Sequence, residues 1–182
     1  MKNRVNRVLG VDVGRVIICP VSADGVEDTS FLSGTEQRAL ETPPCDGAFE
    51  AIRDLVQLFE GRVWLVSKCG PRIQALTRRW LAHQRFHEFT GVPPTHVRFC
   101  LRRPEKRGHC ESIGATHFID DRLDVLQHLR GAVPNLYWFG HQRTGAASPG
   151  WVTPTADFRI ARERIFSDVA RDAEGKPRAR AR

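Results

Sequence analysis

Residues 7–14 read RVLGVDVG, a run rich in aliphatic and β-branched side chains that closes on a glycine. Such a run predicts a buried β-strand over Arg7–Val13, with Gly14 beginning the turn after it. The apolar residues Val16–Cys19 follow too soon for a helix to intervene, so we expect them to extend the strand or to form a hairpin with it. Asp12 therefore lies at the carboxyl end of the first strand.

The same kind of apolar run recurs between helical patterns along the chain. Four more strands are predicted, over Arg62–Ser67, Val97–Leu101, Thr116–Asp120 and Asn135–Phe139. Helical spacing predicts a turn at Glu36–Leu40 and helices over Asp46–Glu60, from Pro71 onward, over Glu105–Ile113, around Leu123–Leu129 and, after a loop at Gly140–Pro154, from Phe158 to Val169. Strands that alternate with helices predict a parallel sheet covered on both faces. The expected fold is α/β, a Rossmann-like three-layer sandwich with about five strands.

Length and composition are those of an ordinary globular domain. The chain has 182 residues, of which 41% are apolar and 27% charged. We expect residues 1–171 to form a single domain and residues 172–182 to be a disordered basic tail. Within that tail Lys176, Arg178, Arg180 and Arg182 supply +4 of the formal net charge of +7. The net charge therefore leaves nucleic acid open as a partner without singling it out.

The sequence also bears on the compartment. No apolar run approaches the roughly 18 residues that span a bilayer, and the N-terminal residues lack the apolar core of a signal peptide. The five cysteines are odd in number and include no C-x-x-C pair, which indicates reduced thiols rather than disulfides or a zinc site. We expect a cytoplasmic protein with no membrane partner.

Polar side chains stand at the carboxyl ends of three predicted strands: Asp12, Ser67 and the pair Asp120 and Asp121. Ligands of a parallel sheet bind outside these ends, where a buried carboxylate must be paired, hydrogen-bonded or bound to a cation. The acids suit Mg²⁺ and substrate phosphate oxygens, and one of them could attack phosphorus. A serine hydroxyl and a lysine ammonium would stabilise the transferred group. The pattern predicts a magnesium-dependent phosphoryl-transfer enzyme.

Four segments taken in order resemble the motifs of the haloacid dehalogenase-like (HAD-like) hydrolase superfamily: VLGVDVG, VWLVS, the lysine of RPEKRGHC, and THFIDD. The resemblance extends from Arg7 to Phe139 and implies a HAD-like fold. It implies that Asp12 is the nucleophile and a magnesium ligand, and that the backbone carbonyl of Gly14 binds the same ion. The other implied roles are phosphoryl binding by Ser67, stabilisation of nucleophile and phosphate by Lys106, and metal binding by Asp120 and Asp121.

Basic residues gather in sequence around the predicted strand ends: Arg15, Lys68, Arg72, Arg102, Arg103, Arg107 and Arg122. A basic rim would raise the local concentration of phosphate esters, although any one of these side chains could equally be a solvated loop residue. Lys68 is the one that we assign to phosphate binding. It directly follows Ser67, and the helix that begins at Pro71 should turn its N-terminus toward the phosphate.

Gly14 departs from the family pattern. Phosphatases of the superfamily usually carry a second aspartate at this position, two residues after the nucleophile, as general acid and base. Branches with a D-x-G-x-V form are similar to this chain and are still regarded as phosphatases. The proton could come from water, from the leaving group's own acidity, or from a water oriented by Arg15. General acid–base assistance is worth about a hundred- to ten-thousand-fold, so a slow, a selective and an inactive protein all remain open.

The spacing leaves no room for a separate cap domain. About 34 residues separate Asp12 from the helix at Asp46, and about 39 separate Ser67 from Lys106, where a helix and a strand are already predicted. We expect a minimal cap and an open site. Family members of this form have sites suited to a large substrate or covered by a partner subunit, which leaves a homo-oligomer open.

The favoured function is a phosphomonoesterase with an aspartyl-phosphate intermediate on Asp12, which acts on a nucleotide, a sugar phosphate or another small phosphate ester. A second hypothesis keeps this chemistry but places it on nucleic-acid ends or on proteins. A third hypothesis is a regulatory module that binds phosphate but has lost turnover, because Gly14 replaces the second aspartate.

Overall fold

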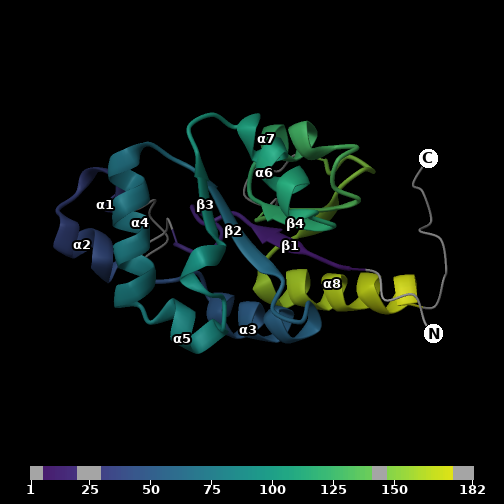
Figure 1. Cartoon of the computed structure of the whole chain (residues 1–182), viewed down its shortest axis with the longest axis horizontal. Helices are drawn as coiled ribbons and strands as arrows, with labels where there is room; N and C mark the ends of the chain where they lie inside the picture. Colours follow the sequence, from purple (N-terminus) through teal and green to yellow (C-terminus); the bar gives the residue numbers. More distant parts are fainter. Residues whose placement is uncertain (1–5, 20–29, 141–146, 174–182) are drawn as a thin grey trace.

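The computed structural model describes residues 6–19, 30–140 and 147–173. Its centre is a six-stranded parallel sheet with the strand order β3-β2-β1-β4-β5-β6 (Figure 1). The strands are β1 (Leu9–Val11), β2 (Val63–Lys68), β3 (Val97–Cys100), β4 (His117–Asp120), β5 (Asn135–Phe139) and β6 (Thr153–Thr155). The order places β1 in the interior of the sheet, between β2 and β4.

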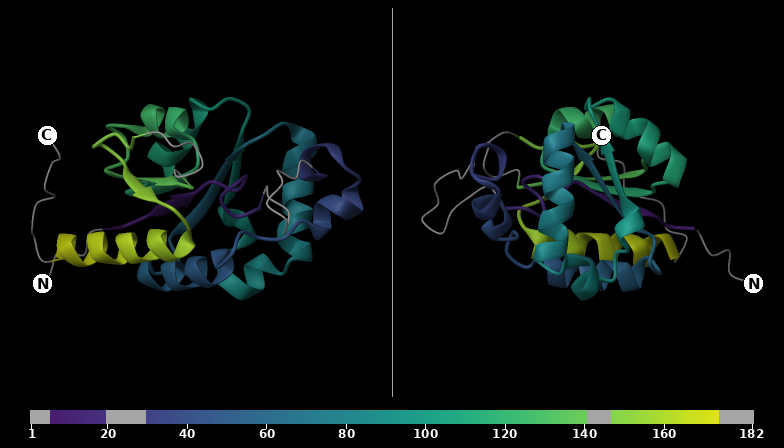
Figure 2. Two further views of the ribbon diagram at one scale, coloured as in Figure 1. Left: turned by 180° about the vertical axis from the view of Figure 1, so that it is seen from behind. Right: turned by 60° about the vertical axis from the view of Figure 1, so that its left-hand side comes forward.

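Helices cover both faces of this sheet, so the fold has three layers (Figures 1 and 2). One face carries α6 (Glu105–Ile113) and α7 (Leu123–Leu129), and the other carries α3 (Ala48–Leu58), α5 (Phe86–Thr90) and α8 (Phe158–Ala173). Two short helices, α1 (Ser30–Ser33) and α2 (Glu36–Glu41), lie beside α4 (Pro71–His83) at one end of the molecule (Figure 1). A single 3₁₀ turn, Pro94–His96, leads into β3.

The predicted α/β fold and its five strands are confirmed, but some of the expected details were wrong. The predicted loop Gly140–Pro154 ends in a sixth strand, in which Thr155 is in register with Phe139 of β5. The segment Thr-Pro-Thr has no apolar alternation, and Pro154 is tolerated because β6 is an edge strand. Its pairing with β5, rather than its own sequence, makes it a strand. Helix α5 was also not predicted, and its Phe86 packs edge-on against Phe49 of α3.

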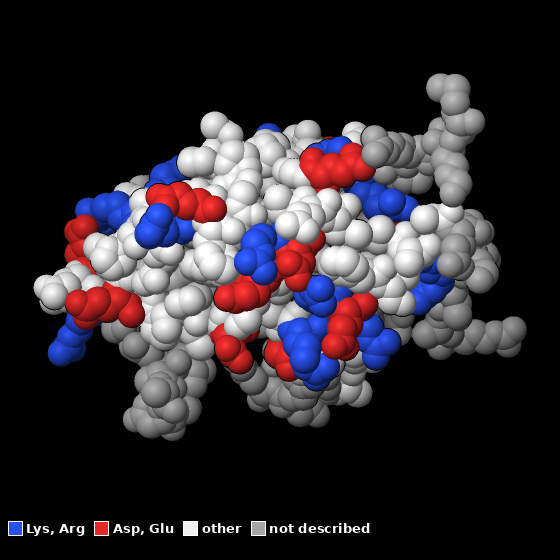
Figure 3. Space-filling model, turned by 90° about the horizontal axis from the view of Figure 1, so that it is seen from below, with Lys and Arg blue, Asp and Glu red and all other residues white. Residues whose placement is uncertain are grey.

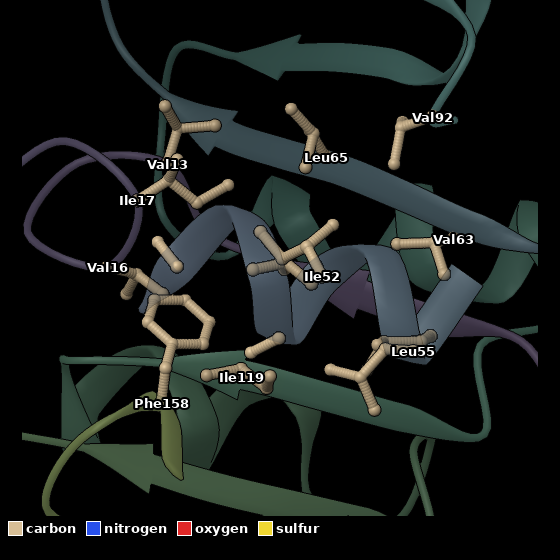
Figure 4. Packing of buried hydrophobic residues seen from close by; sticks show 14 of the residues in the cluster. Val13, Val16, Ile17, Ile52, Leu55, Val63, Leu65, Val92, Ile119 and Phe158 are labelled. Carbon is tan, nitrogen blue, oxygen red and sulfur yellow. The ribbon is translucent and has the colours of Figure 1, made fainter. Parts of the chain in front are cut away.

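The residues after β1 form a tight turn rather than the strand extension or hairpin that we expected. The backbone N–H groups of Ile17 and Ile18 both donate to the carbonyl of Val13, at 2.9 and 3.0 Å. Figure 4 shows Val13, Val16 and Ile17 gathered over α3, near Ile52. The three side chains of the turn are at most 1% exposed, so hydrophobic burial holds this turn closely against the core.

Gly10 in β1 marks a close approach between two strands. A Cβ atom built on Gly10 would lie 2.4 Å from the nearest ring carbon of Phe118 in the neighbouring strand β4. Phe118 is fully buried and packs in the cluster beneath α6 and α7. The absence of a side chain at position 10 therefore allows the Phe118 ring to lie across β1.

The face formed by α3, α5 and α8 has no continuous basic area among the described residues that it displays. Figure 3 shows basic and acidic side chains intermixed over it. One pair joins two of its helices, because Nε of Arg162 in α8 lies 2.7 Å from Oδ2 of Asp54 in α3. Residues 174–182, which hold most of the predicted basic tail, lie outside the described residues. Within the described ranges, no helix is both long and apolar enough to cross a bilayer.

Candidate active site

The carboxyl ends of β1, β2 and β4 meet at one cleft of about 380 Å³. Because β1 pairs with β2 on one side and with β4 on the other, Asp12, Ser67 and Asp120 emerge side by side. All three are buried, at 7%, 7% and 0% exposure. The cleft is lined by Asp12, Gly14, Arg15, Leu32, Ser67, Lys68, Cys69, Gly70, Ile73, Arg103, Lys106, Asp121, Arg122 and Val125.

Lys106 belongs to the helix layer beside the sheet and contacts two of these carboxylates. It lies in the first turn of α6 and its side chain is 2% exposed. Its Nζ atom donates to Oδ1 of Asp12 and to Oδ2 of Asp120, each at 2.7 Å. Burial alone would lower the pKa of Lys106, but the charges of Asp12 and Asp120 outweigh it and hold this pKa above its ordinary value. Lys106 is therefore a fixed ammonium at the floor of the cleft.

Three carboxylates converge opposite this ammonium. Asp12, Asp120 and Asp121 each offer one oxygen, and these oxygens lie within 4.8 Å of one another. Burial raises the pKa of Asp121 to about 6, with the charge of Asp12 adding to the effect. Burial also raises the pKa of Asp120, even though Lys106 opposes the rise. Three acids and one ammonium leave a formal charge of −2 here, which is costly in a buried site.

This cluster fits a divalent cation. Mg²⁺ binds carboxylate oxygens and takes its remaining ligands from water or phosphate, and the three converging acids supply ligands of that kind. A +2 ion would also cancel the excess charge of the floor. The backbone carbonyl of Gly14, implied as a further ligand, belongs to a residue that lines the same cleft.

Ser67 and Lys68 form the side of the cleft at the end of β2. Ser67 is the last buried residue of the strand, and Lys68 is exposed. Gly70 caps the N-terminus of α4 and Pro71 is its first residue, where a missing N–H costs nothing. The N-terminal end of a 13-residue helix therefore follows directly after Ser67 and Lys68, which favours an anion at this side.

The cysteines near the site are not suited to nucleophilic attack. Burial raises the pKa of Cys69, at the edge of the cleft, to about 11. Burial likewise raises the pKa of Cys110, one helical turn after Lys106 in α6, to about 12. Both thiols stay protonated near neutral pH, whereas the thiolate is the reactive form.

The structure separates the seven predicted rim residues into two groups. Arg15, Lys68, Arg103 and Arg122 line the cleft. The other three are not among the residues that line it. Arg102 and Arg107 pair with Glu105 and Glu111 of their own segment, at 2.6 and 2.9 Å, and Arg72 donates to the carbonyl of Leu32.

Leu32 of α1 is a lining residue that sequence reasoning missed, and it is 56% exposed. It stands in a polar stretch with no periodic pattern to signal a role. Ile73 of α4 also lines the cleft. Both positions depend on how α1 and α4 pack around the strand ends.

No protein-family model matches the chain, and no curated protein does. Solved structures do match it. One is the D,D-heptose 1,7-bisphosphate phosphatase from B. bronchiseptica, complexed with magnesium and phosphate. Its TM-score is 0.65 at 14% identity, over 89% of this chain and 99% of that one. Another is the D,D-heptose 1,7-bisphosphate phosphatase from Burkholderia thailandensis, with a TM-score of 0.55 at 12% identity, over 88% and 99%.

The chain shares their fold. This likeness confirms the HAD-like fold that the four motifs predict, and it extends beyond them to nearly the whole length of both neighbours. At this level of identity it is the architecture that is shared, so any activity of this chain has to be argued from its own cleft.

Proposed function

We propose that the chain is a magnesium-dependent phosphomonoesterase whose nucleophile is Asp12. The observation that carries the proposal is the Lys106 ammonium, held at 2.7 Å from both Asp12 and Asp120 on the floor of an open cleft. The convergence of Asp121 with these two acids supports a metal site. The names of the two solved structures, both phosphatases and one with magnesium and phosphate bound, agree with this chemistry.

The residues of the cleft suggest the order of events. Asp12 attacks the phosphorus of the bound ester: the bond from its carboxylate oxygen to phosphorus forms, and the bond from phosphorus to the leaving oxygen breaks. Lys106 orients Asp12, since its ammonium donates a hydrogen bond to Oδ1 of that carboxylate. Water then attacks the aspartyl phosphate, which releases inorganic phosphate and regenerates Asp12.

The transferred phosphoryl group carries charge that the cleft must stabilise. The Ser67 hydroxyl and the Lys68 ammonium, both lining the cleft, are placed to contact its oxygens. A magnesium ion held by Asp12, Asp120 and Asp121, with the carbonyl of Gly14, would supply further charge neutralisation. Asp120 is in addition held in place by the backbone N–H of Arg122, at 2.9 Å.

Gly14 decides how the proton reaches the leaving group. No side chain extends from this position, and a Cβ atom built there would meet nothing within 4 Å. The space beside the nucleophile is therefore open to water. Water protonates the leaving oxygen in this scheme, so esters with acidic leaving groups are the better substrates.

The test is phosphate release from a panel of aryl phosphates and small phosphate esters, with Mg²⁺ and with a chelator. We expect turnover only with the metal, and loss of turnover in Asp12→Asn. Asp54→Asn is the control and should keep wild-type turnover, because Asp54 lies in α3 and pairs with Arg162 of α8. A hydroxylamine-labile phosphoryl group on Asp12, trapped by acid quench, would identify the intermediate. Full turnover by Asp12→Asn would exclude the mechanism.

Gly14 also supports a second candidate, a regulatory module that binds phosphate without turning it over. Wild-type protein that binds phosphate in the presence of Mg²⁺, but releases none from any ester of the panel, would favour it.

A polymeric substrate, nucleic acid or protein, is tested by removing residues 176–182. Loss of binding to phosphorylated oligonucleotides would support that role for the basic end.

A further inference from the structure

The floor of the cleft is balanced in charge once a single divalent cation is bound. Asp12, Asp120 and Asp121 carry −3, Lys106 carries +1, and the cation supplies the remaining +2. The transferred phosphoryl group then meets Ser67, Lys68 and the N-terminus of α4. Three more cations line the same cleft: Arg15, Arg103 and Arg122. Neither the charge balance of the floor nor the binding of the transferred phosphoryl group accounts for them.

Arg103 and Arg122 come from two different loops and meet at one carboxylate. Arg103 lies between β3 and α6, and Arg122 between β4 and α7. Nη1 of Arg103 is 3.5 Å from Asp124, and Nε of Arg122 is 3.0 Å from it. A single carboxylate cannot neutralise two guanidinium groups, and both side chains remain 42% and 46% exposed. The pair thus keeps net positive charge and open donor groups at the rim.

Arg15 adds a third guanidinium at a backbone position that an arginine seldom occupies. Its φ angle is 63°, in the left-handed region, directly after Gly14. A residue other than glycine or asparagine in this region costs about 1 kcal/mol or more, and such strain is concentrated at functional sites. The turn is nevertheless held by the Arg15 N–H, which donates to the Ile18 carbonyl at 3.1 Å. The strained position brings an arginine to the cleft beside Asp12.

We propose that Arg15, Arg103 and Arg122 form a second anion subsite, which binds a phosphate group on the leaving-group side of the substrate. With Asp124 counted, Arg103 and Arg122 together keep a formal charge of +1, which attracts a phosphate group. Guanidinium groups present planar pairs of donors that fit phosphate oxygens. The preferred substrates are then small esters that carry two phosphate groups. This inference rests on the proposed function, because it takes the floor of the cleft as the site of the reacting phosphoryl group.

The experiment measures binding without turnover. Alkane monophosphonates and α,ω-bisphosphonates of matched chain length are titrated calorimetrically into the full-length wild-type protein with Mg²⁺. Phosphonates are not hydrolysed, so the result does not depend on activity. We expect at least one bisphosphonate to bind about tenfold or more tightly than its monophosphonate, with an advantage that shrinks as salt is raised.

Matched variants test whether the tighter binding of bisphosphonates depends on the arginines at the rim of the cleft. Arg103→Gln and Arg122→Gln should each reduce the ratio of monophosphonate to bisphosphonate dissociation constants about fivefold or more. Arg107→Gln is the control, because Arg107 is exposed to a similar extent, at 46%, but pairs with Glu111 and does not line the cleft. It should leave the ratio unchanged.

The outcomes separate the two proposals. If monophosphonates bind and no bisphosphonate binds more than about twofold better, the statistical factor, the second subsite is refuted while the proposed function stands. If the advantage survives in both Arg103→Gln and Arg122→Gln, the assignment to these residues is wrong. If no phosphonate binds at all, the phosphoryl site itself fails. A 5′-phosphorylated oligonucleotide that binds more tightly than every bisphosphonate would overturn the small-substrate form of the proposal.

Discussion

The Nζ atom of Lys106 lies 2.7 Å from Oδ1 of Asp12, a residue 94 positions earlier in the chain. The same ammonium contacts Asp120, so it separates two buried carboxylates that would otherwise face each other directly. In this site the groups proposed for catalysis are also groups on which the stability of the fold depends.

Replacing Lys106 with methionine removes the shared cation of this pair. Loss of one partner from a buried ion pair costs about 3 to 5 kcal/mol, because the remaining charge is left uncompensated. We expect the free energy of unfolding of Lys106→Met, measured by denaturant titration without metal, to fall by that amount, and turnover to be lost. Lys68→Met is the control for stability. Lys68 is exposed, so its change should stay within about 0.5 kcal/mol. Equal unfolding midpoints for Lys106→Met and wild type would contradict the account.

Magnesium should stabilise the protein more strongly as the pH rises. The pKa of Asp121 is raised to about 6, and that of Asp120 is also raised. The folded, metal-free protein therefore binds more protons than the unfolded chain between about pH 4 and pH 6, and its stability falls as pH increases through this window. A cation binds the ionised carboxylates and offsets that loss.

Thermal unfolding with Mg²⁺ and with a chelator, at about pH 5 and about pH 8, measures this difference. We expect the increase in Tm on adding metal to be clearly larger at the higher pH. In Asp121→Asn this pH dependence should shrink, because one of the titrating ligands is gone. A metal effect of the same size at both pH values would show that these carboxylates do not form the binding site.

Adding one methyl group at Gly10 should disturb the strand pair beneath the site. The Cβ atom of Gly10→Ala would lie 2.4 Å from the Phe118 ring, so the ring or the strand has to move. Overpacking of this kind costs about 1 to 3 kcal/mol. Gly108→Ala is the matched control: a Cβ atom there meets nothing within 4 Å, and the residue lies inside α6. It should stabilise the protein by up to about 1 kcal/mol.

A double-mutant cycle locates the clash. Phe118→Leu should lower stability by itself, because it opens a cavity. In that background the additional cost of Gly10→Ala should be smaller by about 1 kcal/mol or more, since the two residues are in contact. Strictly additive effects would mean that the clash is not with Phe118.

Gly14→Asp should restore proton transfer to the leaving group. The position has room for a side chain, because a Cβ atom there has no neighbour within 4 Å. General acid assistance is worth about a hundred- to ten-thousand-fold, and it matters most for a poor leaving group and little for an acidic one. We expect kcat/KM to rise for alkyl phosphates and to change little for nitrophenyl phosphate. An equal change for both classes would show that proton transfer to the leaving group does not limit turnover.

Much of the architecture could be predicted from local patterns. The apolar runs that became β1, β2, β3, β4 and β5 are strongly biased toward strands, and Gly114 and Gly131 end or follow helices as their left-handed φ angles allow. The pairs Arg102–Glu105 and Arg107–Glu111 lie three and four residues apart, so these two arginines had a local partner in sequence that we overlooked. Such features involve neighbouring residues, and short-range sterics and charge decide them.

By itself, then, the sequence determined five of the strands, most of the helices and the polar residues at the strand ends: Asp12, Ser67, and Asp120 with Asp121. Only the tertiary structure decided that β1 lies between β2 and β4, that Lys106 reaches two acids at once, and that the edge strand β6 forms. It also decided which cations line the cleft and that Leu32 joins them. These contacts join residues far apart in the chain, and their energy depends on packing and burial that no local pattern encodes.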